Sequence, residues 1–161
     1  MRRFLLLFAF LAAAGAAAGE TIEGKVVSIQ DGDSLTIVGQ DAKRRRVRLA
    51  EIDAPERKQP FGTESRKSLA AICQGKPVTV EVVATDTHKR AVGKAKCGDI
   101  DANSEQVRRG MAWVTARNTM PNSPLPEMEA NARLRGLGLW AGDKPEPPWE
   151  WRKRQAPPAK K

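Results

Sequence analysis

Short stretches of the chain, beginning near residue 21, alternate between hydrophobic and polar positions. This period of two, bounded by turn-forming residues such as the DGD at 31–33, is typical of β-strands. In RRRVRLAEI the period places Arg44, Arg46 and Arg48 on one face of a strand. The pattern predicts five strands, at about 21–30, 34–38, 44–52, 77–84 and 93–97.

Three other segments are predicted to be helices. The first covers 63–73 and the last covers about 126–135. Between them, ANSEQVRRGMAWV offers Asn103 as an N-cap, Gln106 at the capping-box position and Gly110 as a stop. Five short strands with a helix between the third and the fourth predict a small barrel with about three helices packed on it. This is an α+β fold that is mainly β.

The N-terminal segment MRRFLLLFAFLAAAGAAAGE is predicted to contain a secretory signal peptide over residues 1–19. Two arginines precede an apolar run of about ten residues, and small residues suited to signal peptidase follow. Cleavage is expected after Ala18 or Gly19, and an uncleaved membrane anchor is the alternative. Because no second apolar run of membrane length follows, we expect an exported protein, periplasmic or secreted, that is soluble and monomeric.

The chain is strongly basic. Its formal net charge is +9, and removal of Arg2 and Arg3 with the signal peptide leaves +7. A surplus of this size favours a polyanionic partner and predicts salt-sensitive binding. Part of the charge lies in a Pro-rich basic C-terminal tail at 144–161, which ends in WRKRQAPPAKK. We expect WRKRQAPPAKK, residues 151–161, to be a disordered basic arm, and the Pro-rich stretch before it to run along the surface.

Cys73 and Cys97 are the only cysteines of the chain. An exported protein meets oxidising conditions, so we expect a disulfide between them, with two buried free thiols as the alternative. A zinc site is not expected, because His88 is the only histidine and two cysteines cannot complete such a site.

The stretch VRLAEIDAPE crowds three carboxylates, Glu51, Asp53 and Glu56, into six positions after Arg48. If the second and third predicted strands form a hairpin, Asp33 lies opposite this stretch and meets Asp53 at one end of the barrel. Oxygen ligands without histidine or thiolate suit a hard cation, calcium before magnesium. A solvated acidic turn is the alternative interpretation of the acids alone.

Four motifs together resemble staphylococcal nuclease and its exported relatives: IQDGDSLTI, RVRLAEIDAPE, FGTESRKSLA and GLGLW…PPWEW. The resemblance covers about residues 21–152, and the D-G-D motif combined with R-L-x-x-I-D-x-P-E is specific at its spacing. It implies an OB-fold-like barrel domain at 20–143 and a calcium-dependent endonuclease with little sugar specificity. Its partners are then DNA and RNA, as single strands or locally opened duplexes.

The resemblance also implies roles for individual residues. Asp33 and Asp53 match the calcium-binding aspartates of the family, and the main-chain carbonyl of Ala54 matches a further ligand. The family usually has threonine at the position of Ala54, and ligation by the carbonyl alone tolerates the change. Glu56 matches the carboxylate regarded as the general base, and Arg48 matches one of the two arginines that hold the phosphate.

The second phosphate-binding arginine is expected in a hairpin where relatives read D-x-Y-G-R and this chain reads DTHKR. Arg90 fits the arginine position, but His88 replaces the tyrosine and Lys89 replaces the glycine. Lys94 or Lys89 is the alternative cation. The chain contains no tyrosine, so its base pocket must differ from the tyrosine-framed pocket of the family's nuclease.

Two other classes of function stay open at the level of sequence. The first is an OB-fold module that binds nucleic acid but has lost catalysis, although binding alone has no need of acids that repel phosphate. The second is a disulfide-stabilised envelope structural or adhesion protein, which leaves the acidic cluster unexplained.

Overall fold

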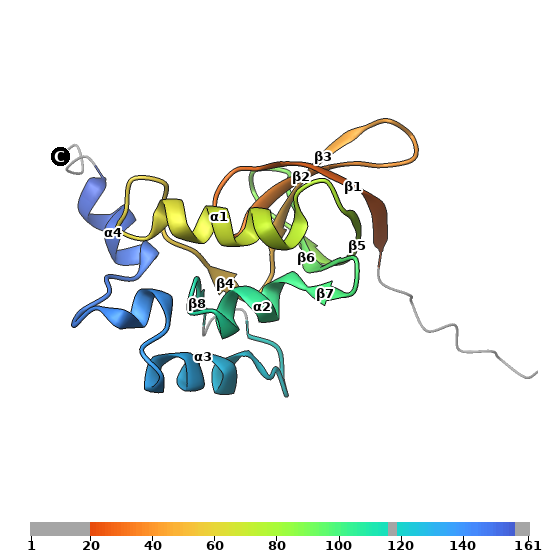
Figure 1. Ribbon diagram of the computed structural model, residues 1–161. Coiled ribbons are helices and arrows are strands. Elements are labelled where there is room, and N and C mark those ends of the chain that lie inside the picture. Colours follow the sequence, from red (N-terminus) through yellow and green to blue (C-terminus); the bar gives the residue numbers. More distant parts are fainter. Residues whose placement is uncertain (1–19, 116–118, 157–161) are drawn as a thin grey trace, which may run out of the picture.

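The computed structural model describes residues 20–115 and 119–156. Its centre is a closed barrel of five strands (Figure 1). The strands are β1 (Thr21–Ile29), β2 (Ser34–Val38), β3 (Arg44–Leu49), β5 (Pro77–Thr85) and β6 (Ala91–Cys97). Neighbouring strands are antiparallel in the order β3-β2-β1-β5-β6, and a parallel pairing of β3 with β6 closes the barrel. The five-stranded barrel predicted from the sequence is confirmed.

Three two-residue strands complete the sheets. β7 (Ile100–Asp101) pairs with β6, whereas β4 (Ile52–Asp53) pairs with β8 (Trp113–Val114) in a separate two-stranded sheet. The prediction of one strand over 44–52 was therefore wrong. The chain turns after Leu49, and Glu51 adopts the left-handed conformation with a φ of 66°, which ends regular strand pairing. As a result, β4 carries Asp53 away from the barrel sheet and toward the helices.

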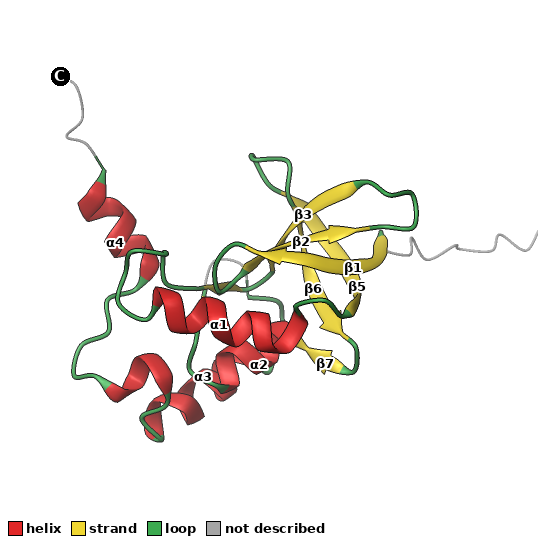
Figure 2. Ribbon diagram, turned by 45° about the horizontal axis from the view of Figure 1, so that its top comes forward, coloured by secondary structure: helices red, strands yellow, loops and turns green. Residues whose placement is uncertain are grey.

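In the described part of the chain, four α-helices lie on one side of the barrel, as the two views in Figures 1 and 2 show. They are α1 (Gly62–Cys73), α2 (Ala102–Arg108), α3 (Leu125–Leu134) and α4 (Pro148–Gln155), and a short 3-10 helix, η1, covers Gly138–Ala141. The first three correspond to the predicted helices. None of the helices in the described part of the chain combines the length and apolarity that crossing a membrane requires.

The alternation in the sequence sorts side chains between core and surface. In β3, Val47 and Leu49 are buried, whereas Arg44 and Arg46 are exposed. Leu69 and Ile72 of α1 complete the same hydrophobic core, so the helix stabilises the barrel by removing apolar surface from water. The other large, fully buried side chains of the barrel strands are Val26, Leu35, Ile37 and Val80.

The predicted disulfide between Cys73 and Cys97 is present in the structure. It joins the last residue of α1 to the last residue of β6, and both cysteines are fully buried. The bond therefore ties the first helix to the barrel.

The start of α2 differs from the prediction. Asp101, not Asn103, is the N-cap, because its side chain accepts a hydrogen bond from the backbone N–H of Ser104 at 2.7 Å. Asn103 is instead buried within the helix, where it donates to the Ala50 carbonyl at 2.9 Å and accepts from the Ala95 N–H at 3.0 Å. Helix α2 ends at Arg108, and Gly110 follows with a positive φ, as predicted for a stop.

Gln106 likewise has a different role from the capping-box role predicted for it. Its side chain is fully buried and donates to the Gly32 carbonyl at 2.7 Å and to the Ser65 carbonyl at 3.2 Å. A Cβ atom at Gly32 would collide with the Ser65 hydroxyl. Together these contacts fix the DGD turn against α1 and α2, and with it the position of Asp33.

The C-terminal tail is the largest departure from the sequence analysis. Residues 151–155, expected to be part of a disordered arm, belong to helix α4 (Pro148–Gln155), which lies near the N-terminal end of α1 (Figures 1 and 2). Pro148 occupies the first turn, where its missing N–H costs nothing. The end of the predicted tail, 157–161, and the predicted signal peptide, 1–19, lie outside the described residues.

Candidate active site

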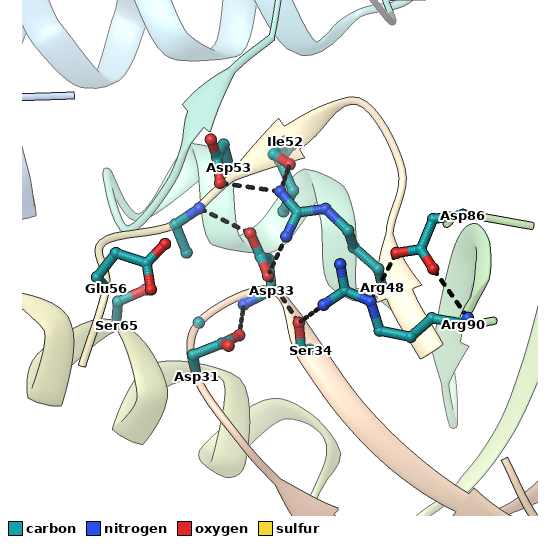
Figure 3. Close-up of polar contacts among 12 residues, drawn as sticks. Asp31, Asp33, Ser34, Arg48, Ile52, Asp53, Glu56, Ser65, Asp86 and Arg90 are labelled. Atoms are coloured by element: carbon teal, nitrogen blue, oxygen red, sulfur yellow. Dashed lines mark hydrogen bonds and ion pairs between the residues drawn. The ribbon is translucent and has the colours of Figure 1, made fainter. Parts of the chain in front are cut away.

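Arg48 lies between two buried aspartates at one end of the barrel (Figure 3). The β2–β3 register pairs Ser34 with Arg48, which places Asp33 next to the arginine. The Nη1 atom of Arg48 lies 3.2 Å from Asp33 Oδ1, and Nη2 lies 2.8 Å from Asp53 Oδ1. The hairpin thus brings Asp33 to Asp53 as the sequence predicted.

Three further hydrogen bonds hold Asp33, two accepted by its carboxylate and one donated by its backbone. Its Oδ1 atom accepts from the Ser34 hydroxyl at 2.9 Å, and its Oδ2 atom accepts from the Ala54 backbone N–H at 2.9 Å. Its own N–H donates to Asp31 Oδ1 at 3.0 Å. These contacts fix the carboxylate with no freedom to rotate toward solvent, and they bring Ala54 against it.

Burial raises the pKa of Asp33 to about 7, against the opposing effect of the Arg48 charge. The charges of Asp31 and Asp53 raise this pKa further. Nearby positive charge and hydrogen bonds stabilise the ionised form of such a carboxylate. Arg48, which lies between the two aspartates, supplies that charge here.

Asp33, Asp53 and Ala54 could hold a hard metal ion. Carboxylate and carbonyl oxygens are the ligands that calcium and magnesium take. Within residues 20–115 and 119–156, no three acidic, histidine or cysteine side chains gather closely enough to hold a metal ion by themselves. The residues present thus fit an ion that completes its shell with water and with oxygen atoms of a bound molecule.

Glu56 lies in the loop after β4, on the side of Asp33 away from Arg90 in the view of Figure 3. Its backbone N–H donates to Gln59 Oε1 at 3.0 Å, and its carbonyl accepts from the Gln59 N–H at 2.9 Å. Its side chain is 40% exposed. The carboxylate is therefore anchored by its backbone and can reach solvent.

Arg152 of α4 reaches into the same site, and sequence reasoning missed it. Its Nη1 atom lies 2.7 Å from Glu56 Oε1, and its Nη2 atom lies 2.6 Å from Asp53 Oδ2. Hydrogen bonds to Asp53 and Glu56 raise the pKa of Arg152, although burial alone would lower it. The sequence signal was the arginine after PPWEW, which was interpreted as part of a solvated basic tail.

Arg90 lies beside Arg48 and faces Ser34 (Figure 3). Its Nε atom lies 2.7 Å from Asp86 Oδ2, and its Nη1 atom donates to the Ser34 hydroxyl at 3.4 Å. Asp86 also accepts from the Arg90 backbone N–H at 2.9 Å, and these contacts lower the pKa of Asp86 although burial acts in the opposite direction. The hairpin thus holds Arg90 at the site.

The substitutions in the hairpin do not remove its turn. Lys89 adopts the left-handed conformation, with a φ of 58°, that favours the glycine of the relatives' pattern. Lys94, the alternative cation, has its Nζ atom 3.8 Å from Glu51 Oε1. Glu51 is buried and accepts from the Met120 backbone N–H at 3.0 Å, so its contacts are structural.

The groups at this site are of the types that bind and hydrolyse a phosphodiester. Arg48 and Arg90 offer guanidinium groups, which match the oxygen atoms of a phosphate through paired N–H donors. Glu56 is a carboxylate exposed to solvent next to them, as a group that takes a proton from water must be. The row of Arg44 and Arg46 along β3 extends the positive charge away from the site.

Comparison with known proteins supports this interpretation. Residues 46–142 match the family described as "Staphylococcal nuclease homologue". A protein of Escherichia coli O157:H7 named "Uncharacterized endonuclease" is 39% identical over 136 residues, which cover 83% of this chain and 87% of that protein. A Haemophilus influenzae protein with the same name is 36% identical over 152 residues, 94% of this chain and 83% of its own length. A "Staphylococcal-like nuclease" of Arabidopsis thaliana is 34% identical over 131 residues, 81% of this chain and 38% of its own length.

Proposed function

Because this chain belongs to the staphylococcal nuclease family and is a nuclease, a hydrolase of the phosphodiesterase type, we propose that it is a calcium-dependent endonuclease acting on both DNA and RNA. The observation that carries the proposal is the grouping of Arg48 between Asp33 and Asp53, with Glu56 three residues farther along the chain. These residue types supply the metal ligands, the phosphate-binding cation and the base that such a reaction needs.

Asp33, Asp53 and the Ala54 carbonyl are the residues proposed to hold calcium. Two carboxylates and a carbonyl, without nitrogen or sulfur ligands, suit this ion, which tolerates a flexible shell completed by water. Calcium bound there supplies positive charge that polarises a phosphoryl oxygen. Magnesium demands stricter octahedral geometry, so we expect it to support less cleavage.

Glu56 is proposed to take the proton from the attacking water. Its carboxylate is exposed to solvent while its backbone is held by Gln59. Arg48 and Arg90 are proposed to contact the phosphate oxygens, where negative charge grows in the transition state. Arg90 is held for this by Asp86, which leaves its Nη1 atom directed at the Ser34 hydroxyl.

The proposed substrate range follows from what these groups recognise. Guanidinium groups and a metal ion read phosphate, which DNA and RNA share, and phosphate contacts carry no sequence information. Single strands or locally opened duplexes present a phosphate with the least obstruction, so we propose them as the bound form. A monomer is sufficient, because all the proposed groups come from one chain.

Export is also part of the proposal. The Cys73–Cys97 disulfide supports it, because structural disulfides persist chiefly in oxidising compartments such as the periplasm and the medium.

Digestion of plasmid DNA and of a ribosomal RNA, each with calcium, with magnesium or with chelator, tests the proposed function. We expect both substrates to be cut with calcium and neither with chelator. Glu56→Gln should slow cleavage by about 10²- to 10⁴-fold, the usual cost of losing a general base. Arg48→Ala should do so by a comparable factor, whereas Arg46→Ala, on the same exposed strand face, should retain most of the rate.

Rapid cleavage in chelator would contradict the calcium assignment. Binding of DNA in a gel shift without cleavage under any condition would indicate a binding module instead, and the absence of both would favour a structural envelope protein.

A further inference from the structure

We propose that Arg152, on the C-terminal helix α4, is a positioning residue of the active site that holds the Glu56 carboxylate in its working orientation. The inference rests on the proposed function, in which Glu56 is the general base. It adds a residue that lies outside the 46–142 segment matched by the family and inside what the sequence predicted to be a tail.

Glu56 needs such a partner because its side chain extends from a loop into solvent. Among the described residues, Arg152 is the one group within hydrogen-bond or ion-pair distance of the Glu56 carboxylate. The contact joins Arg152 Nη1 to Glu56 Oε1 at 2.7 Å. With Oε1 held, Oε2 has a defined direction in which to receive a proton. A catalytic base is commonly oriented by a third group in this way.

Arg152 can orient Glu56 because it is itself fixed by a rigid neighbour. Its Nη2 and Nη1 atoms lie 2.6 Å and 3.2 Å from the two oxygens of Asp53. The Asp53 side chain is 95% buried, and Arg48 holds it from the other side at 2.8 Å. The base is thus connected through Arg152 and Asp53 to the barrel strand β3.

The helix that carries Arg152 is anchored by the residue that also anchors Glu56. Gln59, which is buried, accepts from the Glu56 backbone N–H at 3.0 Å and donates to the Glu146 carbonyl at 2.6 Å. Arg154 is 56% exposed and pairs with the Glu146 side chain at 2.7 Å, a contact that takes no part in this anchor. One buried side chain therefore sets the distance between the loop of the base and the start of α4.

The contacts of Arg152 leave room for the proposed chemistry. Each carboxylate oxygen has two lone-pair sites. Asp53 Oδ1 accepts from both Arg48 and Arg152, whereas Oδ2 accepts from Arg152 alone, so one position on Oδ2 is left for a cation. An inhibitory contact, in which Arg152 only blocked the site, would need neither the free oxygen of Glu56 nor the shared anchor at Gln59. The geometry points to a group that stays in place during the reaction.

Three variants test the inference in steady-state cleavage of a DNA strand at saturating calcium. Arg152→Ala should lower kcat by about 10- to 100-fold, the scale of effect expected when a catalytic group is misplaced, with little change in KM. Arg154→Ala is the matched control, since it removes the same charge from an exposed position on the same helix, and it should keep the wild-type kcat. Arg152→Lys should fall between them, because an ammonium cannot bridge two carboxylates as a guanidinium does.

Two further measurements separate positioning from a general structural role. Millimolar guanidinium ion should restore part of the activity of Arg152→Ala and none of that of Glu56→Gln. In a double-mutant cycle, Arg152→Ala should lower kcat only slightly further when Glu56→Gln is already present, because the two residues act as one unit. DNA affinity in chelator, measured by fluorescence anisotropy, should be alike for Arg152→Ala and Arg154→Ala.

The inference is overturned if wild type cleaves DNA but Arg152→Ala has the same kcat as Arg154→Ala. It is also overturned if the loss of kcat caused by Arg152→Ala adds fully to the loss caused by Glu56→Gln. A higher kcat for Arg152→Ala than for wild type would show that Arg152 inhibits the site instead. A wild-type protein that cleaves nothing would contradict the proposed function itself, which is a different result from any of these.

Discussion

At the scale of the residue, Arg48 resolves a conflict that the carboxylates create. Asp33 and Asp53 are both buried, and their charges raise the free energy of the folded state unless a cation lies between them. Arg48 lies there and contacts both. Its position in β3 follows from the alternation that buries Val47 and Leu49, so the same pattern that forms the core also places the arginine.

Arg90 allows a sharp comparison with its neighbour Lys89. Arg90→Ala should reduce the cleavage rate at saturating calcium and DNA by about 10²- to 10³-fold, since it removes a donor at the developing charge. Lys89→Ala should leave the rate near wild type, because the exposed Lys89 serves the turn through its positive φ and not through its charge.

If Lys89→Ala loses most of the cleavage rate and Arg90→Ala does not, the second phosphate-binding cation is misassigned. Near wild-type rates for both variants would show that the hairpin supplies no catalytic cation. Circular dichroism spectra of both proteins should match wild type, which separates loss of chemistry from loss of fold.

At the scale of the element, two features link chain segments that the sequence leaves far apart. The disulfide fixes the end of α1 to the end of β6, and Gln59 fixes the loop of Glu56 to the segment before α4. The first constrains the barrel and the second constrains the site. Their removal should therefore have different consequences.

Replacing both Cys73 and Cys97 by alanine should lower the free energy of unfolding by about 3 kcal/mol, the loop-entropy value for a bond that spans 24 residues. The melting temperature should fall by roughly 10 °C. Cleavage at 25 °C should be unchanged, because neither cysteine contacts the site. The account of the disulfide fails if the melting temperature is unaltered, or if protein isolated from cells titrates with two free thiols.

The elements also show where sequence reasoning succeeds and where it stops. Hydrophobic alternation predicted the barrel strands because burial on one face sets their period. It could not predict the break at Glu51, since nothing local distinguishes that glutamate from a strand residue. Asn103 was assigned as a cap on the basis of its residue type, whereas tertiary contacts use its amide to join Ala50 to Ala95.

At the scale of the whole molecule, the site is assembled from both ends of the chain. The turn before β2, the loop after β4, the β5–β6 hairpin and α4 each contribute one or more charged groups. Local motifs predicted the first three contributions. The fourth could not be predicted, because Arg152 is charged, lies in a basic run and meets Asp53 only through the fold, 99 residues away in sequence.

Calcium binding and cleavage, followed in one titration of the same protein, test the central claim most directly. Isothermal calorimetry should find one calcium ion per chain, and the midpoint of the cleavage rate should coincide with the measured Kd. Asp53→Asn should lose both signals, whereas Asp99→Asn, an exposed aspartate in a turn after β6, should keep both. Cleavage that persists in chelator, or wild-type calcium affinity in Asp53→Asn, would contradict the account.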